Sequence, residues 1–126
     1  MNAGDIIYNT LIADAGVAAI VAGRIYPIDA PLDVDLPCCY YGVQLAQTVD
    51  GSAPLSTAQI TVGCLAHSEA TVHSLAAAVH AAIDGLTGTR SGTWLRGARQ
   101  LNRTEDRDAE NNLWGVVLVY GASVTY

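Results

Sequence analysis

Apolar side chains between residues 66 and 86 recur at the spacing i, i+3, i+4, i+7, which is typical of one face of a helix. Ser68 precedes this stretch as a candidate N-cap, and Gly85 follows its last turn. The pattern predicts an amphipathic helix that covers a sheet and leaves His73 and His80 exposed on its other face. The apolar face consists of Val72, Leu75, Ala76, Val79, Ile83 and Leu86.

Alternating apolar and polar residues predict the strands of that sheet. The alternating segments are Arg24–Ile28, Cys38–Val49, Ser56–Leu65, Thr93–Asn102 and Leu113–Tyr126. Their predicted apolar sides are Cys39, Tyr41, Val43 and Leu45; Ile60, Val62 and Cys64; Leu95, Gly97 and Leu101; and Trp114, Val116, Leu118 and Tyr120. The last segment is also apolar on its second side, at Val117 and Val119. We therefore expect it to lie centrally or to be covered by another subunit.

The remaining segments complete the predicted fold. Helical spacing indicates two short helices at Asp5–Ala13 and Gly16–Ala22, and glycine- or proline-bearing segments indicate connections at Asp29–Pro37 and Gly85–Gly92. Arg103–Asn112 is charged and has no apolar anchor, so we expect a mobile hairpin loop that orders only against a partner protein. The prediction is a single α+β domain over residues 1–126. It has an antiparallel or mixed β-sheet, one long amphipathic helix packed on one face and a short N-terminal helical segment.

Charge is distributed unevenly along the chain, whose net charge is −6. Residues 1–85 contain eight acids and one arginine, whereas residues 86–126 contain four acids and five arginines. An acid-free basic strip contains Arg90, Arg96, Arg99 and Arg103. The densest acidic segment contains Asp29, Asp33 and Asp35. This polarity is typical of a subunit that places a basic side against an acidic side of its neighbour. Four arginines form a small patch in an acidic protein, so we expect no specific nucleic-acid binding.

The candidate metal ligands are poorly spaced. His73 and His80 would lie ~10 Å apart along the helix axis, too far for one ion. His80 and Asp84 are one turn apart and could share a metal, but a solvated polar helix face explains the pair equally well. The three cysteines, Cys38, Cys39 and Cys64, lack the CxxC spacing of zinc sites and are interpreted as reduced core thiols.

Signatures of catalysis are missing from the sequence. It contains no GxSxG elbow. Its glycine-rich segment GLTGTRSG follows a predicted helix, whereas the glycine-rich loop of a P-loop precedes its helix. A P-loop also requires a lysine, and this chain has none. We therefore expect no enzymatic activity and no cofactor. No run of eighteen or more apolar residues is present, and the first ten residues do not resemble a secretory signal, so we expect no membrane association.

One short motif and the order of the elements resemble a known family. Val21–Pro27 reads VAGRIYP, and the acidic segment after it ends in Leu36–Pro37. With the helices before and the strand–helix–strand pattern after, this resembles the tail-completion (tail-terminator) proteins of long-tailed bacteriophages. The resemblance implies a structural virion protein without catalytic residues. It would form a homo-oligomeric, commonly hexameric ring that caps the tail tube at its head-proximal end and joins tail to head. Assembly would take place in the host cytoplasm.

The expected contacts follow from the charge pattern and the resemblance. The expected partners are further copies of the chain, the tail tube protein and the head–tail connector or stopper protein. Candidate subunit-interface residues are Asp29, Asp33, Asp35, Arg90, Trp94, Arg96, Arg99 and Trp114. Candidate residues of a partner-binding loop are Arg103, Glu105, Asp106, Arg107, Asp108 and Glu110. The two tryptophans are equally compatible with the core.

Three alternatives remain open from the sequence. A small-molecule- or peptide-binding α+β module, or a minor subunit of an enzyme, would show a pocket with convergent polar groups. A nucleic-acid binder would rest on the arginine strip alone. Self-association of the purified chain would favour the ring-forming virion protein over these alternatives.

Overall fold

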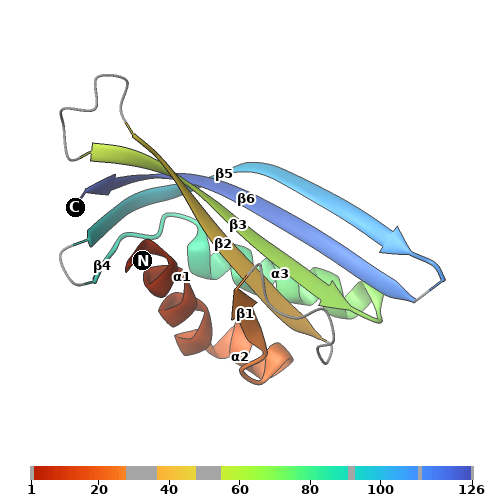
Figure 1. Ribbon diagram of the computed structural model, residues 1–126. Coiled ribbons are helices and arrows are strands. Elements are labelled where there is room, and N and C mark those ends of the chain that lie inside the picture. Colours follow the sequence, from red (N-terminus) through yellow and green to blue (C-terminus); the bar gives the residue numbers. More distant parts are fainter. Residues whose placement is uncertain (1, 28–36, 48–54, 91–92, 111, 126) are drawn as a thin grey trace.

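The computed structural model describes residues 2–27, 37–47, 55–90, 93–110 and 112–125. Two helices come first, followed by three strands, a third helix and three further strands (Figure 1). The helices are α1 (Asn2–Ala13), α2 (Ala15–Val21) and α3 (Glu69–Ile83). The strands are β1 (Ile25–Pro27), β2 (Cys38–Gln47), β3 (Leu55–Ala66), β4 (Gly88–Arg90), β5 (Thr93–Asp108) and β6 (Leu113–Thr125).

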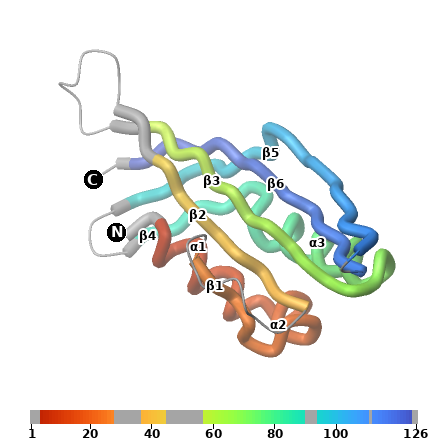
Figure 2. Tube along the Cα trace, turned by 45° about the vertical axis from the view of Figure 1, so that its right-hand side comes forward, coloured from red at the N-terminus to blue at the C-terminus, as the bar shows by residue number. Residues whose placement is uncertain are grey.

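The six strands form one mixed sheet in the order β1-β2-β3-β6-β5-β4. Only the outermost pair, β1 and β2, is parallel; all the others are antiparallel. The three helices lie together on one face of this sheet, with α3 across β3 and β6 (Figures 1 and 2). The prediction of an α+β fold with a mixed sheet and β6 in a central position is therefore confirmed.

The core lies between the helices and this face of the sheet. The predicted face of α3 is buried at Val72, Leu75, Ala76, Val79 and Ile83, and Leu86 packs against the same core. The strands contribute the apolar positions predicted by alternation, among them Cys39, Ile60, Val62, Cys64, Val116, Leu118 and Tyr120. Their burial is the main favourable term in folding, since each large aliphatic side chain removed from water contributes about 1.5–3 kcal/mol.

The helices differ from the prediction in length. The expectation of one long helix beside a short N-terminal segment is wrong, because α1 has 12 residues and α3 has 15. Helix α1 also begins at Asn2, so Asp5 lies in its first turn instead of capping it. The predicted cap of the second helix is confirmed, since the Asp14 carboxylate accepts a hydrogen bond from the Val17 amide at 3.0 Å.

Strands β4 and β5 correct three expectations. It continues to Asp108, so most of the predicted loop Arg103–Asn112 is strand paired with β6. Part of the predicted connection after α3 is strand β4. The register of β5 shifts twice, near Gly97, whose φ is +64°, and near Leu101. These irregularities reverse the alternation, so Leu95 is buried while Leu101 is 63% exposed. The prediction that these two residues lie on the same side of the strand is therefore wrong.

Two further points concern the limits of the fold. Nearly all of the predicted connection Asp29–Pro37 lies outside the described residues. Among the described residues, no single helix has the length and apolarity needed to cross a membrane. The helical segments Gly4–Ala13 and Ala15–Val21 have this length and apolarity only when they are counted together, and they are bent by 82° relative to each other.

Candidate subunit interface

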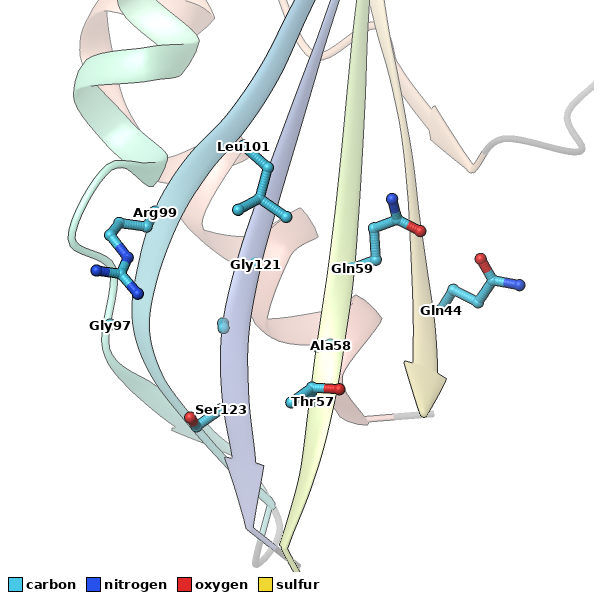
Figure 3. Close-up of a pocket in the computed structure, with 10 residues that line it drawn as sticks. Gln44, Thr57, Ala58, Gln59, Gly97, Arg99, Leu101, Gly121 and Ser123 are labelled. Atoms are coloured by element: carbon cyan, nitrogen blue, oxygen red, sulfur yellow. The ribbon is translucent and has the colours of Figure 1, made fainter. Parts of the chain in front are cut away.

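The face of the sheet that points away from the helices carries the most extensive candidate site. A row of directly opposed residues crosses its four long strands, from Gln44 through Gln59 and Gly121 to Arg99. The helices lie behind this row in Figure 3, so its side chains point to the uncovered side. We call this surface the open sheet face; its residues are Gln44, Thr57, Gln59, Trp94, Arg96, Arg99, Leu101, Gly121 and Ser123.

A hollow of about 490 Å³ lies at the centre of the open sheet face. Gly121 forms part of its floor because it has no side chain, and Leu101 lies across it (Figure 3). A Cβ atom at Gly121 would stand 3.0 Å from Cδ1 of Leu101. The shift of register in β5 thus places an exposed apolar side chain over a glycine on the neighbouring strand.

The rest of the hollow is polar. Gln44, Thr57, Gln59 and Ser123 supply amides and hydroxyls, and Arg99 supplies the only charge among the described lining residues. A surface of amides and one cation, with a single exposed leucine, has hydrogen-bonding groups for a protein partner. The described part of the hollow contains neither a thiol nor a carboxylate that could act as a nucleophile or base.

Trp94 and Arg96 extend the open sheet face toward β4. The Arg96 guanidinium lies 4.0 Å from the centre of the Trp94 ring, and the tryptophan remains 43% exposed. Tryptophan and arginine are enriched among the residues that contribute most to protein–protein binding. Of the sequence-based interface candidates, the structure thus brings Trp94, Arg96 and Arg99 to one side.

The other arginines of the predicted strip lie elsewhere. Arg90 is in β4, the edge strand. Arg103 stands 3.8 Å from Glu105, which also binds the Nε2 atom of His73 on α3 at 2.7 Å. The arginines of the predicted strip are therefore divided between the two sides of β5. Although they are close in sequence, they do not form one continuous basic patch.

The hairpin end of β5 and β6 packs toward α3. Arg107 lies 4.6 Å from the centre of the Trp114 ring, which packs against the core and is half-buried. A second hollow, of about 350 Å³, separates the hairpin from the first turns of α3. It is lined by Glu69, Val72, His73, Glu105, Asp106, Arg107, Trp114, Gly115 and Val116. Trp114 thus contributes to the core side of the hairpin, and the structure does not place it beside Trp94.

The predicted partner-binding loop has a different structure. Arg103, Glu105, Asp106, Arg107 and Asp108 are in β5, and only Glu110 lies in the turn that follows. The prediction of a mobile loop is wrong for the strand residues because pairing with β6 supplies the backbone hydrogen bonds that these six polar residues, Arg103–Asp108, lack locally. Asp29, Asp33 and Asp35 lie outside the described residues.

The polar residues of α3 also have specific partners. His73 is exposed, as predicted, but His80 is only half-exposed, because its Nδ1 atom lies 2.8 Å from the hydroxyl of Tyr120. Burial raises the pKa of Tyr120 to about 12, and the neighbouring Asp84 carboxylate adds to this increase. No group of three or more potential metal ligands occurs among the described residues.

Several residues of the open sheet face were not singled out by the sequence. Gln44, Gln59 and Ser123 occupy the polar positions of alternating strands, where they are typical of any solvated face. The alternating pattern predicts the wrong side for Leu101, because the irregular register of β5 has no clear sequence signal apart from Gly97. For the glutamines, the alternation of apolar and polar residues is the sequence signal that predicts which side of the sheet they occupy.

Comparisons with known proteins agree with this architecture. A chain from the solved structure "Virion of native gene transfer agent (GTA) particle" has the same fold, with a TM-score of 0.81 and 24% sequence identity. The alignment covers 95% of this chain and 92% of that one. A search of curated protein sequences finds no match. The family described as "Tail completion protein gp17" matches residues 6–125, nearly the whole sequence, and the chain belongs to this family of phage tail completion proteins.

Proposed function

We propose that the chain is a structural virion subunit that assembles into a homo-oligomeric ring, commonly a hexamer in such proteins. The ring caps the tail tube at its head-proximal end and joins it to the head. It contacts the tail tube protein and the head–tail connector, and it is assembled in the host cytoplasm. Residues 1–126 act in it as a single domain. Membership of the tail completion family supports a structural role in the virion, and the ring extends that role.

The open sheet face is the observation that supports self-assembly. It combines exposed Trp94 and Leu101 with the cations of Arg96 and Arg99, all on the side of the sheet that the helices leave uncovered. In a ring, every subunit meets its neighbours through two different surfaces, so a basic surface of one copy can meet an acidic surface of the next. We propose that the acidic segment with Asp29, Asp33 and Asp35 contributes to that second surface.

The two kinds of side chain have different roles in this contact. Charges at the rim of an interface mainly steer the encounter and fix its register, whereas desolvated apolar and aromatic groups supply most of the affinity. Arg96 and Arg99 would therefore affect the rate and the salt dependence of association. Trp94 and Leu101 would contribute more to the lifetime of the ring.

The test is a matched pair of charge reversals in the full-length protein. Arg96→Glu changes the open sheet face, and Arg107→Glu changes an arginine of the same strand that stacks on Trp114 toward the helices. Light scattering at several concentrations should show an oligomer, and Arg96→Glu should weaken association on the order of tenfold or more. Arg107→Glu should leave association nearly unchanged. A monomer at every concentration, or a larger effect of Arg107→Glu, would contradict the proposal.

A small-molecule or peptide ligand is the alternative that the same experiment addresses. The hollow over Gly121 has convergent polar groups, but it lies on the uncovered face of a sheet instead of inside the fold (Figure 3). A binding site of high affinity for a small molecule normally encloses most of the ligand. Membership of a structural tail protein family also speaks against turnover.

A further inference from the structure

Two of the three cysteines face each other across neighbouring strands. Cys39 of β2 lies directly opposite Cys64 of β3 in the antiparallel register, and both side chains are fully buried against the helices. Both are free thiols. Cys38, although adjacent in sequence, points to the opposite side of β2 because successive residues of a strand alternate.

Backbone hydrogen bonding shows which type of cross-strand pair this is. The Cys39 amide donates to the carbonyl oxygen of Arg24, next to β1, at 3.0 Å. In an extended strand the N–H and C=O groups of one residue point to the same edge, so those of Cys39 point away from β3. Cys39 and Cys64 are therefore a non-hydrogen-bonded pair, the kind in which opposite side chains approach most closely.

This geometry suits a disulfide. Opposed residues in non-hydrogen-bonded pairs have Cα atoms about 4.5 Å apart, and disulfides span Cα separations of about 4.4–6.8 Å. We propose that Cys39 and Cys64 form a specific site of oxidative modification, at which a small-molecule disulfide such as oxidised glutathione converts the two thiols into a cross-strand disulfide.

The reaction balances without any other reactant. One cysteine thiolate attacks a sulfur of the glutathione disulfide, so a mixed disulfide forms and one glutathione leaves as a thiolate. The second cysteine thiolate attacks the protein sulfur of the mixed disulfide, the Cys39–Cys64 bond forms, and the second glutathione leaves. The protein loses two electrons and two protons, and the glutathione disulfide gains both and becomes two thiols.

Burial decides when the reaction can take place. Both side chains are fully buried in the folded chain, and desolvation disfavours the reactive thiolate. Oxidation therefore requires the strands to separate, or it takes place while the chain is folding. Once formed, the bond would staple β2 to β3, the strands that carry Gln44 and Gln59 of the open sheet face.

The experiment unfolds the full-length chain in urea and dilutes it into a mixture of reduced and oxidised glutathione. Free thiols are then alkylated in denaturant and located by mass spectrometry. We expect two of the three thiols to be lost, with only Cys38 alkylated, and we expect the melting temperature to rise. Dithiothreitol should restore three alkylated cysteines and the original melting temperature.

Three variants make the result specific. Cys38→Ser should still form the bond and retain no free thiol, whereas Cys39→Ser and Cys64→Ser should each keep both remaining thiols. A mixture of the three alternative pairings, or three alkylated cysteines in the refolded wild-type chain, would overturn the proposal. If a variant does not fold, the alkylation map of the wild-type chain decides the question by itself.

Discussion

Tyr120 joins the core to the polar face of α3. Its residue surface is fully buried, and its hydroxyl lies 2.8 Å from Nδ1 of His80, whose Nε2 atom is 3.9 Å from Asp84. A buried tyrosine needs a partner for its hydroxyl, because an unpaired polar group in the core costs about 1–3 kcal/mol. His80 therefore acts as a structural partner of the core and not as a freely solvated residue.

The raised pKa of Tyr120 predicts a loss of stability in alkali. Its usual pKa is 10.0, and in the folded chain it is about 12. Between these values the unfolded chain releases the proton while the folded chain keeps it, so stability falls as pH rises. This contribution is complete below pH 10 and is lost as pH rises through 12. Tyr120→Phe should reduce the decrease in urea midpoint between about pH 9 and about pH 11. An unchanged decrease in the variant would show that Tyr120 is not responsible.

Leu75 provides a test of the helix orientation. It is fully buried on α3, and its neighbour Ser74 is exposed. Leu75→Ala should lower the free energy of unfolding by about 2–5 kcal/mol, because it removes buried methyl groups and leaves a cavity. Ser74→Ala on the same helix should change it by less than about 0.5 kcal/mol. Urea denaturation of both variants measures the difference, and equal effects would mean that the helix is turned the wrong way.

At the scale of elements, β5 presents a long edge. Strand β4 pairs with Thr93–Leu95, and Ala98 exchanges backbone hydrogen bonds with Gly85 and Leu86. From Arg99 to Arg107, β5 has no neighbouring strand on this side among the described residues. An unpaired edge of this length is a template for uncontrolled pairing between chains. Two of its backbone amides are already bonded, since those of Arg103 and Arg107 donate to the Oδ1 atoms of Asn102 and Asp106 at 2.9 and 2.8 Å. These side chains protect the edge.

Removing this protection should cause unspecific association. Asn102→Val and Asp106→Val, made together, free both amides and add β-branched side chains that favour strand pairing. Light scattering of the double variant should rise with time, and a dye that binds cross-β structure should report the product. Thr104→Val lies between the two sites and adds the same side chain without removing the acceptor of either amide, so it is the matched control. Equal aggregation of control and double variant would show that hydrophobicity, and not the freed amides, is responsible.

At the scale of the whole molecule, the fold separates two surfaces of different character. The helices cover one face of the sheet (Figure 1). The open sheet face on the other side carries Arg99 (Figure 3) and Arg96, which lies opposite Ser123 in the strand register. The strongly acidic first part of the chain contains the helices. A molecule that is polarised in this way can associate head to tail with copies of itself.

The proposed contact predicts a dependence on salt. Raising the ionic strength to about 1 M shortens the Debye length to about 3 Å, which screens the pairing of rim charges. We therefore expect the rate of association to fall with salt, and the emission of exposed Trp94 to shift to shorter wavelength as the oligomer forms. Trp94→Phe removes this signal while retaining Trp114, which packs against the core. A rate independent of salt would show that these arginines do not steer the encounter.

Much of the architecture could be predicted from local patterns. The apolar face of α3, the cap at Asp14 and the inward sides of β3 and β6 follow from side-chain periodicity, which a single helix or strand already contains. The family could be inferred because its motif and order of elements are linear features of the chain. The charge polarity of the two parts of the sequence is likewise a property of composition.

The remaining features depend on contacts between distant residues. The strand at Arg103–Asp108 exists because β6 supplies its hydrogen bonds, and Leu101 faces outward because the register shifts against that same strand. The pairing of Cys39 with Cys64 and of His80 with Tyr120 needs strand order and helix placement. Side-chain periodicity thus determined which elements form and which of their sides face the core. Only the tertiary structure decided which polar groups meet, because pairing satisfies backbone and side-chain groups that no local segment can satisfy alone.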